Sequence, residues 1–162
     1  MRRIFCDMDG VIVDFDALMR ELGVNGDQIC GMKGAFEQMK PIPGAIEHIH
    51  KLIEDGFDVW LATKPPTDYT HAHTEKANWV KNYLPTLLSK LIITTDKGLL
   101  GQQGDFLIDD RPHKANCMKF PGVLIHYRED FGWPEIYKYI HEEVRSEVKI
   151  GTGDQGSLQE EQ

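Results

Sequence analysis

Residues 3–11, RIFCDMDGV, set the architecture of the chain because they join a short apolar run to a sharp polar turn. Residues 3–7 are expected to form a buried strand, since their apolar side chains show no strict alternation with polar ones. Asp7, Asp9 and Gly10 come at the end of this run. The pattern predicts a strand that delivers two carboxylates into a turn at its carboxyl end.

Four more apolar runs have the same character, and they cover residues 57–63, 90–94, 105–110 and 122–127. Segments with helical spacing lie between or after them, at residues 44–55, 68–84 and 133–144. Short buried strands that alternate with helices are typical of βαβ units. We therefore predict an α/β fold, a doubly wound Rossmann-like parallel sheet with helices over both faces.

Residues 14–40 stand apart from this alternation and are interpreted as an insertion between the first strand and its crossover helix. They begin with a short amphipathic helix, continue through the glycine-rich VNGDQICGMKG and end before Pro41. The sequence thus predicts one domain over residues 1–150, with residues 14–40 as a small helical cap. Residues 151–162, GTGDQGSLQEEQ, contain one apolar side chain, Leu158, and are expected to form a flexible tail.

Composition excludes several classes of function. The net charge of −8 disfavours a polymeric nucleic acid as partner, because such binding depends on clustered Lys and Arg. No apolar run reaches the roughly 18 residues needed to cross a bilayer, and aspartates interrupt the N-terminal segment where a signal peptide would be apolar. Three cysteines without CxxC spacing indicate reduced thiols, so a cytoplasmic protein is expected. The sequence leaves undecided whether the chain forms a homodimer.

Polar residues follow four of the five expected strands. In chain order these residues are Asp7 and Asp9, Thr63 and Lys64, Asp96 and Lys97, and Asp109 and Asp110. Parallel strands bring their carboxyl ends to one edge of the sheet, and ligands of open α/β sheets bind beyond that edge. The sequence therefore predicts that these side chains share one crevice.

Such a crevice needs positive charge. Two carboxylates about 4 Å apart repel each other by roughly 4 kcal/mol at an effective dielectric constant near 20. Carboxylate ligands with an incomplete protein cage suit Mg²⁺, which is commonly shared with a substrate phosphate, and Lys97 would add a further positive charge. We therefore expect phosphoryl transfer from a small phosphate ester, in which Asp7 attacks phosphorus and Asp9 protonates the leaving oxygen.

These motifs resemble a known superfamily. DMDGV at residues 7–11, ATK at 62–64, Lys97 and LIDD at 107–110 are similar, in this order, to the four motifs of haloacid dehalogenase (HAD) superfamily phosphotransferases. DMDGVIVDF, KPIPGAIEHIHKL, EKANWVKNYL, TTDKGLL and DFLIDDRP further resemble the 5′(3′)-deoxyribonucleotidase family, across residues 3–128. The resemblance implies a HAD-like fold and a Mg²⁺-dependent 5′-nucleotidase that removes phosphate from deoxyribonucleoside monophosphates.

The resemblance also implies roles for individual residues. Asp7 would be the nucleophile and Asp9 the general acid and base. Mg²⁺ would be bound by Asp7, the carbonyl oxygen of Asp9 and the pair Asp109 and Asp110, with Asp110 preferred as the direct ligand.

The substrate would be held by a second group of residues. The resemblance implies that Thr63 and Lys97 bind the phosphate and that Phe15 contacts the nucleoside. Lys64 stands where relatives have a small residue and would add a phosphate contact. The insertion is shorter than the cap of the vertebrate-type enzymes, which leaves Phe36 as the candidate aromatic stand-in against the base.

Two other functions stay open at this stage. One is a HAD phosphatase for a sugar phosphate or another small metabolite, which would use the same catalytic residues. The other is a phosphorylatable receiver-like switch, which also joins an acidic pair, a Thr and a Lys around Mg²⁺. The order of residues disfavours the switch, because receivers carry the acidic pair at the first strand and the lysine last.

Overall fold

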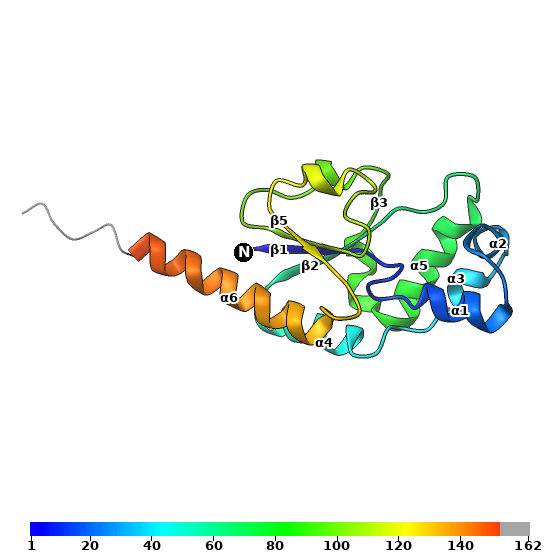
Figure 1. Ribbon diagram of the computed structural model, residues 1–162, viewed down its shortest axis with the longest axis horizontal. Coiled ribbons are helices and arrows are strands. Elements are labelled where there is room, and N and C mark those ends of the chain that lie inside the picture. The colour runs from blue at the N-terminus through cyan, green and yellow to red at the C-terminus, as the bar shows by residue number, and fades with distance from the viewer. Residues whose placement is uncertain (153–162) are drawn as a thin grey trace, which may run out of the picture.

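The computed structural model describes residues 1–152, and its centre is a five-stranded parallel sheet in the order β3-β2-β1-β4-β5 (Figure 1). The strands are β1 (Arg3–Cys6), β2 (Asp58–Thr63), β3 (Leu91–Ile93), β4 (Phe106–Asp109) and β5 (Val123–His126). Each strand lies within one of the five runs predicted from the sequence. The predicted α/β fold with a Rossmann-like parallel sheet is confirmed.

The centre of the sheet is the point where its winding changes direction. β1 pairs with β2 on one side and with β4 on the other, so Cys6 lies opposite both Leu61 and Ile108. The chain first builds outward from β1 to β2 and β3, and then returns to add β4 and β5 on the other side. A ligand site is expected outside this switch point, beyond the carboxyl ends of β1 and β4.

One face of the sheet is covered by three α-helices, which are α4 (Ala45–Glu54), α5 (His71–Tyr83) and α6 (Trp133–Thr152). Ile4 and Cys6 point into this layer and share a core with Ile49, Trp79 and Ile136 from the helices. The helices match the three predicted segments, although α6 runs on past residue 144. This apolar layer holds the helices against the sheet.

The other face of the sheet differs from the prediction. Phe5, Ala62 and Leu107 pack there against Cys117 and Phe120, beneath the short 3₁₀ turns η2 (Lys97–Leu99) and η3 (Cys117–Lys119). The expectation of helices over both faces was wrong for this side. The two connections on this side, residues 94–105 and 110–122, each contain a 3₁₀ turn of three residues in place of an α-helix. A third 3₁₀ turn, η1 (Pro85–Lys90), follows α5.

Residues 14–40, which we name the cap segment, form three short helices at the carboxyl end of the sheet (Figure 1). They are α1 (Phe15–Leu22), α2 (Gly26–Gly31) and α3 (Ala35–Gln38). The segment leaves and rejoins the sheet layer through paired backbone: the Asp14 amide donates to the Lys40 carbonyl at 2.8 Å, and the Ile42 amide donates to the Ile12 carbonyl at 2.9 Å. This pairing fixes the base of the cap segment beside the strand ends.

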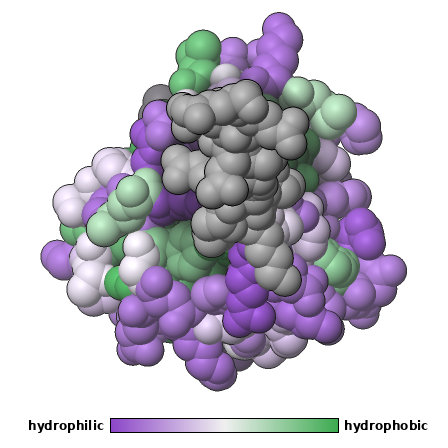
Figure 2. Space-filling model, turned by 90° about the vertical axis from the view of Figure 1, so that its left-hand side faces the viewer, coloured by the Kyte–Doolittle hydropathy of each residue, from purple (hydrophilic) through white to green (hydrophobic). Residues whose placement is uncertain are grey.

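The amino ends of the strands face away from the cap segment, and the part of that end visible in Figure 2 is predominantly hydrophilic. Gly151 and Thr152 are the last residues of α6, and the remainder of the predicted tail, residues 153–162, lies outside the described residues. Among the helices of residues 1–152, none combines the length and apolar character needed to cross a membrane.

Candidate active site

The turn after β1 carries the first two candidate residues, Asp7 and Asp9. The Asp7 amide donates to the Ile108 carbonyl at 2.9 Å, which continues the pairing of β1 with β4 by one residue. The Met8 carbonyl then accepts the amides of all three residues 11–13, so the chain curls tightly past Asp9. Strand pairing thus fixes the position of Asp7, and the turn fixes the position of Asp9.

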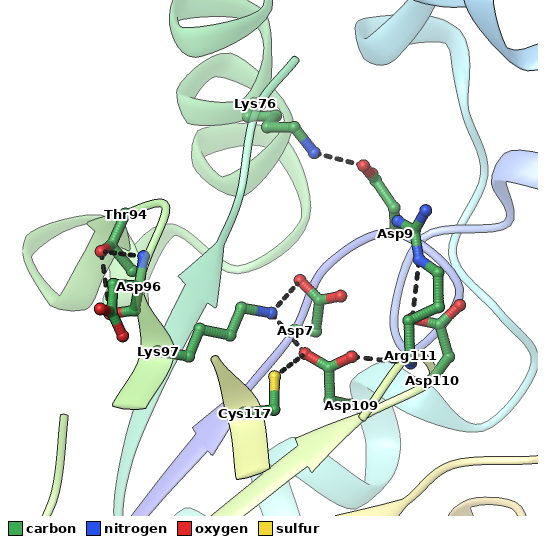
Figure 3. Close-up of polar contacts among 10 residues, drawn as sticks. All are labelled: Asp7, Asp9, Lys76, Thr94, Asp96, Lys97, Asp109, Asp110, Arg111 and Cys117. Carbon is green, nitrogen blue, oxygen red and sulfur yellow. Dashed lines mark hydrogen bonds and ion pairs between the residues drawn. The ribbon is translucent and has the colours of Figure 1, made fainter. Parts of the chain in front are cut away.

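A lysine joins two of the carboxylates. Lys97 Nζ lies 2.8 Å from Asp7 Oδ1 and 2.6 Å from Asp109 Oδ2, and the Lys97 side chain is almost fully buried (Figure 3). Asp109 Oδ2 also accepts a hydrogen bond of 3.3 Å from the Cys117 thiol. Asp109 Oδ1 accepts one of 2.7 Å from the backbone amide of Arg111. Both oxygens of Asp109 are therefore engaged within the protein, and this residue holds Lys97 beside Asp7.

A second buried lysine binds Asp9. Lys76 Nζ, from α5, lies 2.6 Å from Asp9 Oδ2 (Figure 3). The sequence pattern predicted no role for Lys76 in the site. One signal was present, because Lys76 shares the buried stripe of its helix with Ala72, Trp79 and Val80. A lysine on a buried stripe requires an anionic or polar partner.

Most of the predicted residues converge on one cavity of about 760 Å³. Those that line it are Asp7, Asp9, Phe15, Lys64, Lys97, Asp109 and Asp110. Asp16 and Asp27 of the cap segment and Arg111 and Lys114 after β4 also contribute to its wall. The cavity therefore lies between the cap segment and the carboxyl ends of the strands.

Three predicted residues are not in the cavity lining. Asp96 lies apart from it, and its carboxylate accepts hydrogen bonds from the Gly98 amide and the Asn116 side chain. Thr63 is buried at the end of β2, directly before Lys64, and its Oγ1 has no hydrogen-bond partner among the described residues. Phe36 is buried behind Phe15, with their ring centroids 6.1 Å apart. The structure therefore places Phe15 against the cavity and Phe36 in the packing beneath it.

The cluster has an excess of negative charge. Burial raises the pKa of Asp7 to about 7, and Asp109 and Asp9 act in the same direction, whereas Lys97 opposes them. Burial also raises the pKa of Asp110 above its ordinary value. Burial lowers the pKa of Lys97, but Asp7 and Asp109 together raise it above its ordinary value. Lys97 thus stays charged, while the carboxylates need further positive charge to be ionised together.

The donor set fits a small divalent cation. Asp7, Asp109 and Asp110 each offer a carboxylate oxygen, and these oxygens all lie within 4.8 Å of one another. Asp110 Oδ1 is buried and has no hydrogen-bond partner among the described residues. Four carboxylates face two buried ammonium groups in this region, so the residues present suit a cation of two positive charges with a preference for oxygen, such as Mg²⁺.

Most of the chain matches one known protein family. Residues 28–146 match the model of the family described as 5′ nucleotidase, deoxy (pyrimidine), cytosolic type C protein (NT5C). The chain belongs to this family. The matched region contains α5, β2, β4 and the candidate residues from Thr63 to Asp110. The matched region therefore includes most of the cavity-lining residues outside the turn after β1.

Individual relatives carry related names. The chain is 40% identical over 80 residues to a protein of Bordetella bronchiseptica named "Putative 5′(3′)-deoxyribonucleotidase", which is 49% of this chain and 42% of that protein. It is 27% identical over 144 residues to the human mitochondrial 5′(3′)-deoxyribonucleotidase, or 68% of this chain and 62% of that protein. The human cytosolic type matches at 27% over 143 residues, or 67% and 70%. The chain thus spans less than two thirds of the Bordetella and human mitochondrial relatives.

Proposed function

We propose that this chain is a Mg²⁺-dependent phosphomonoesterase that removes phosphate from deoxyribonucleoside monophosphates through an aspartyl-phosphate intermediate. The observation that carries the proposal is the position of Asp7, which lies in the cavity against Lys97 and within reach of the oxygens of Asp109 and Asp110. The relatives named 5′(3′)-deoxyribonucleotidase support the choice of substrate.

The metal would be held by Asp7, the backbone carbonyl of Asp9 and Asp110. Asp110 is preferred over Asp109 as a direct ligand because its Oδ1 accepts no hydrogen bond from the described residues and has Arg111 Nε only at ion-pair distance, 3.8 Å, whereas both oxygens of Asp109 already accept hydrogen bonds. When bound, Mg²⁺ supplies the positive charge that keeps the carboxylates ionised and balances the substrate phosphate.

Three protein residues have different roles in the two chemical steps. Asp7 attacks phosphorus, so that a bond forms between its carboxylate oxygen and phosphorus while the ester bond to the nucleoside breaks. Asp9 gives a proton to the leaving oxygen and later takes one from the water that hydrolyses the acyl phosphate, which restores Asp7 and releases phosphate. Lys97, already 2.8 Å from Asp7, stabilises the anionic groups during both steps.

Substrate binding is assigned to neighbouring residues. Thr63 and Lys97 would hold the phosphate oxygens, and the free hydroxyl of Thr63 supports this role. Lys64 lies at the cavity wall and would add an outer contact. Phe15, in the first turn of α1, would pack against the nucleoside. The free state of all three cysteines of the chain supports action in the cytoplasm.

A phosphatase for a sugar phosphate or another small metabolite is the second candidate. It is favoured by the cavity wall, in which Phe15 is the one aromatic side chain among the described lining residues. A receiver-like switch is disfavoured by the sheet, because the order β3-β2-β1-β4-β5 differs from the 2-1-3-4-5 order of that class.

Phosphate release from a substrate panel tests the proposal. The panel contains dUMP, dTMP, dCMP, dAMP, the matching ribonucleotides and several sugar phosphates, each with Mg²⁺ and with EDTA. We expect a preference for deoxyribonucleotides, loss of turnover in EDTA and a decrease of at least about 10³-fold in Asp7→Asn. Asp130→Asn, which makes the same chemical change at an exposed position, serves as control.

Each part of the proposal has its own contrary result. An even profile over nucleotides and sugar phosphates would reject the nucleotidase and favour the general phosphatase. Full turnover in Asp7→Asn would reject the covalent mechanism. A long-lived adduct with acetyl phosphate would favour the switch.

A further inference from the structure

We propose that Lys76 is a positioning residue, which holds Oδ2 of Asp9 and leaves Oδ1 as the oxygen that exchanges the proton with substrate. The inference rests on the proposed function, in which Asp9 is the general acid and base. It adds a residue from α5 to a site otherwise built from the strand ends.

The two oxygens of Asp9 have different surroundings. Oδ2 accepts a hydrogen bond of 2.6 Å from Lys76 Nζ, whereas Oδ1 is buried and has no hydrogen-bond partner among the described residues. The ammonium group of Lys76 can only donate hydrogen bonds, so Oδ2 is engaged as its acceptor. Oδ1 is therefore the oxygen available to a leaving group.

Lys76 is itself fixed from several sides. Its side chain is 1% exposed, and its Nζ lies 4.7 Å from the centre of the Phe36 ring. The neighbouring carboxylate of Glu75 accepts the backbone amides of Gly34 at 2.6 Å and Phe36 at 3.2 Å. One turn of α5 thus holds both the end of the cap segment and the acid of the site.

The burial of Lys76 argues for a specific role. An ammonium group removed from water is costly unless it is paired, and Asp9 is its ion-pair partner among the described residues. The two buried lysines serve different carboxylates, since Lys97 binds Asp7 and Asp109 (Figure 3). Lys76 can therefore affect proton transfer without holding the nucleophile.

The experiment compares two leaving groups in Lys76→Met. Deoxyuridine is a poor leaving group that needs a proton from Asp9, whereas p-nitrophenolate leaves without one. We expect kcat/KM for dUMP to fall by about 30-fold or more, within the range of general acid catalysis, and kcat/KM for p-nitrophenyl phosphate to change by less than about threefold. Asp9→Asn is expected to show the same asymmetry.

Two further variants separate positioning from structure. Lys81→Met removes an exposed lysine from the same helix and is expected to change neither rate. In an Asp9→Asn background, Lys76→Met is expected to cause no further loss for dUMP, because both changes remove one function. If thermal melting shows that Lys76→Met does not fold, Lys76→Gln gives the same comparison of substrates.

The outcomes distinguish this inference from the proposed function. Equal losses for both substrates in a folded Lys76 variant, or an additive loss in the double variant, would reject positioning and leave a purely structural lysine. A wild-type chain that releases no phosphate from either compound would reject the proposed function and this inference with it.

Discussion

At the scale of single residues, the absence of a side chain at Gly10 determines how closely Asp110 approaches the turn after β1. Gly10 has φ of +77°, and a Cβ added there would lie 2.3 Å from Asp110 Oδ2. The glycine therefore serves two purposes, because it permits the backbone conformation and leaves room for a carboxylate of the cluster.

Replacement of Gly10 tests the second purpose. Gly10→Ala and Gly56→Ala both place a side chain at positive φ, but the position at Gly56 has open space around it. Both variants are expected to lose about 1 kcal/mol or more of unfolding free energy in urea titrations. Only Gly10→Ala is expected to lose phosphate release, by up to about 10²-fold, because it displaces Asp110. Similar activity in the two variants would contradict this role for Gly10.

Prediction of individual residues from sequence depended on their position along strands. Asp7, Lys97 and Asp109 follow apolar runs, so their common location could be inferred from the rule for parallel sheets. Lys76 follows no strand and lies mid-helix, 67 residues from Asp9. Its role depends on which element packs over the turn, and spacing along the chain does not contain that information.

At the scale of elements, the contact between α4 and α6 includes a charged group. Asp55 at the end of α4 accepts a hydrogen bond from the Tyr137 hydroxyl at 2.6 Å, and its Oδ2 lies 3.0 Å from His141 Nε2. Tyr137 is the main stabilising partner that holds the pKa of Asp55 below its ordinary value of 3.8, and His141 adds to this effect. The carboxylate thus links two helices on the same face of the sheet.

This link predicts a pH dependence of stability. Because the folded state lowers the pKa of Asp55, its contribution is present above pH 3.8 and is lost as the pH falls through the lowered value. Asp55→Ala is expected to cost less than about 1 kcal/mol at pH 7, since the group is solvent-exposed. Urea unfolding at several pH values measures the difference, with Glu54→Ala as the exposed control. A cost that persists unchanged at pH 3 would show that the carboxylate is not its source.

Element prediction succeeded where one segment contains the whole signal. The strands and the helices over one face have apolar patterns long enough to be recognised locally. The other face was predicted incorrectly because its cover comes from the connections at residues 94–105 and 110–122, which contain only short 3₁₀ turns. Which connections cover a face follows from strand order, which is a property of the assembled sheet.

At the scale of the whole molecule, folding gathers negative charge from distant parts of the chain. Asp7 and Asp110 lie at opposite ends of the motif series, and the parallel sheet brings their oxygens within 4.8 Å. The chain already carries a net charge of −8, so this concentration opposes folding in the absence of a cation. Metal binding should therefore stabilise the whole fold.

Thermal melting measures this coupling without reference to activity. Saturating Mg²⁺ is expected to raise Tm by on the order of 5 °C, because it binds the folded state alone. Asp110→Asn is expected to lose most of the shift, and Asp130→Asn to retain it. KCl at matched ionic strength controls for screening. An equal shift with KCl would show that general screening, and not a specific site, stabilises the protein.

The order of residues within short stretches was sufficient to predict the five strands, the helices of one face and the motif residues at the strand ends. Each of these features leaves an apolar pattern or a polar break within a few residues. Three features required the folded chain: the pairing of Lys76 with Asp9, the burial of Phe36 behind Phe15, and the cover of the second face of the sheet. Each of them is a contact between residues of different secondary-structure elements or connections. Such contacts depend on how the cap segment, α5 and the strand ends pack together, and no single stretch of residues encodes that packing.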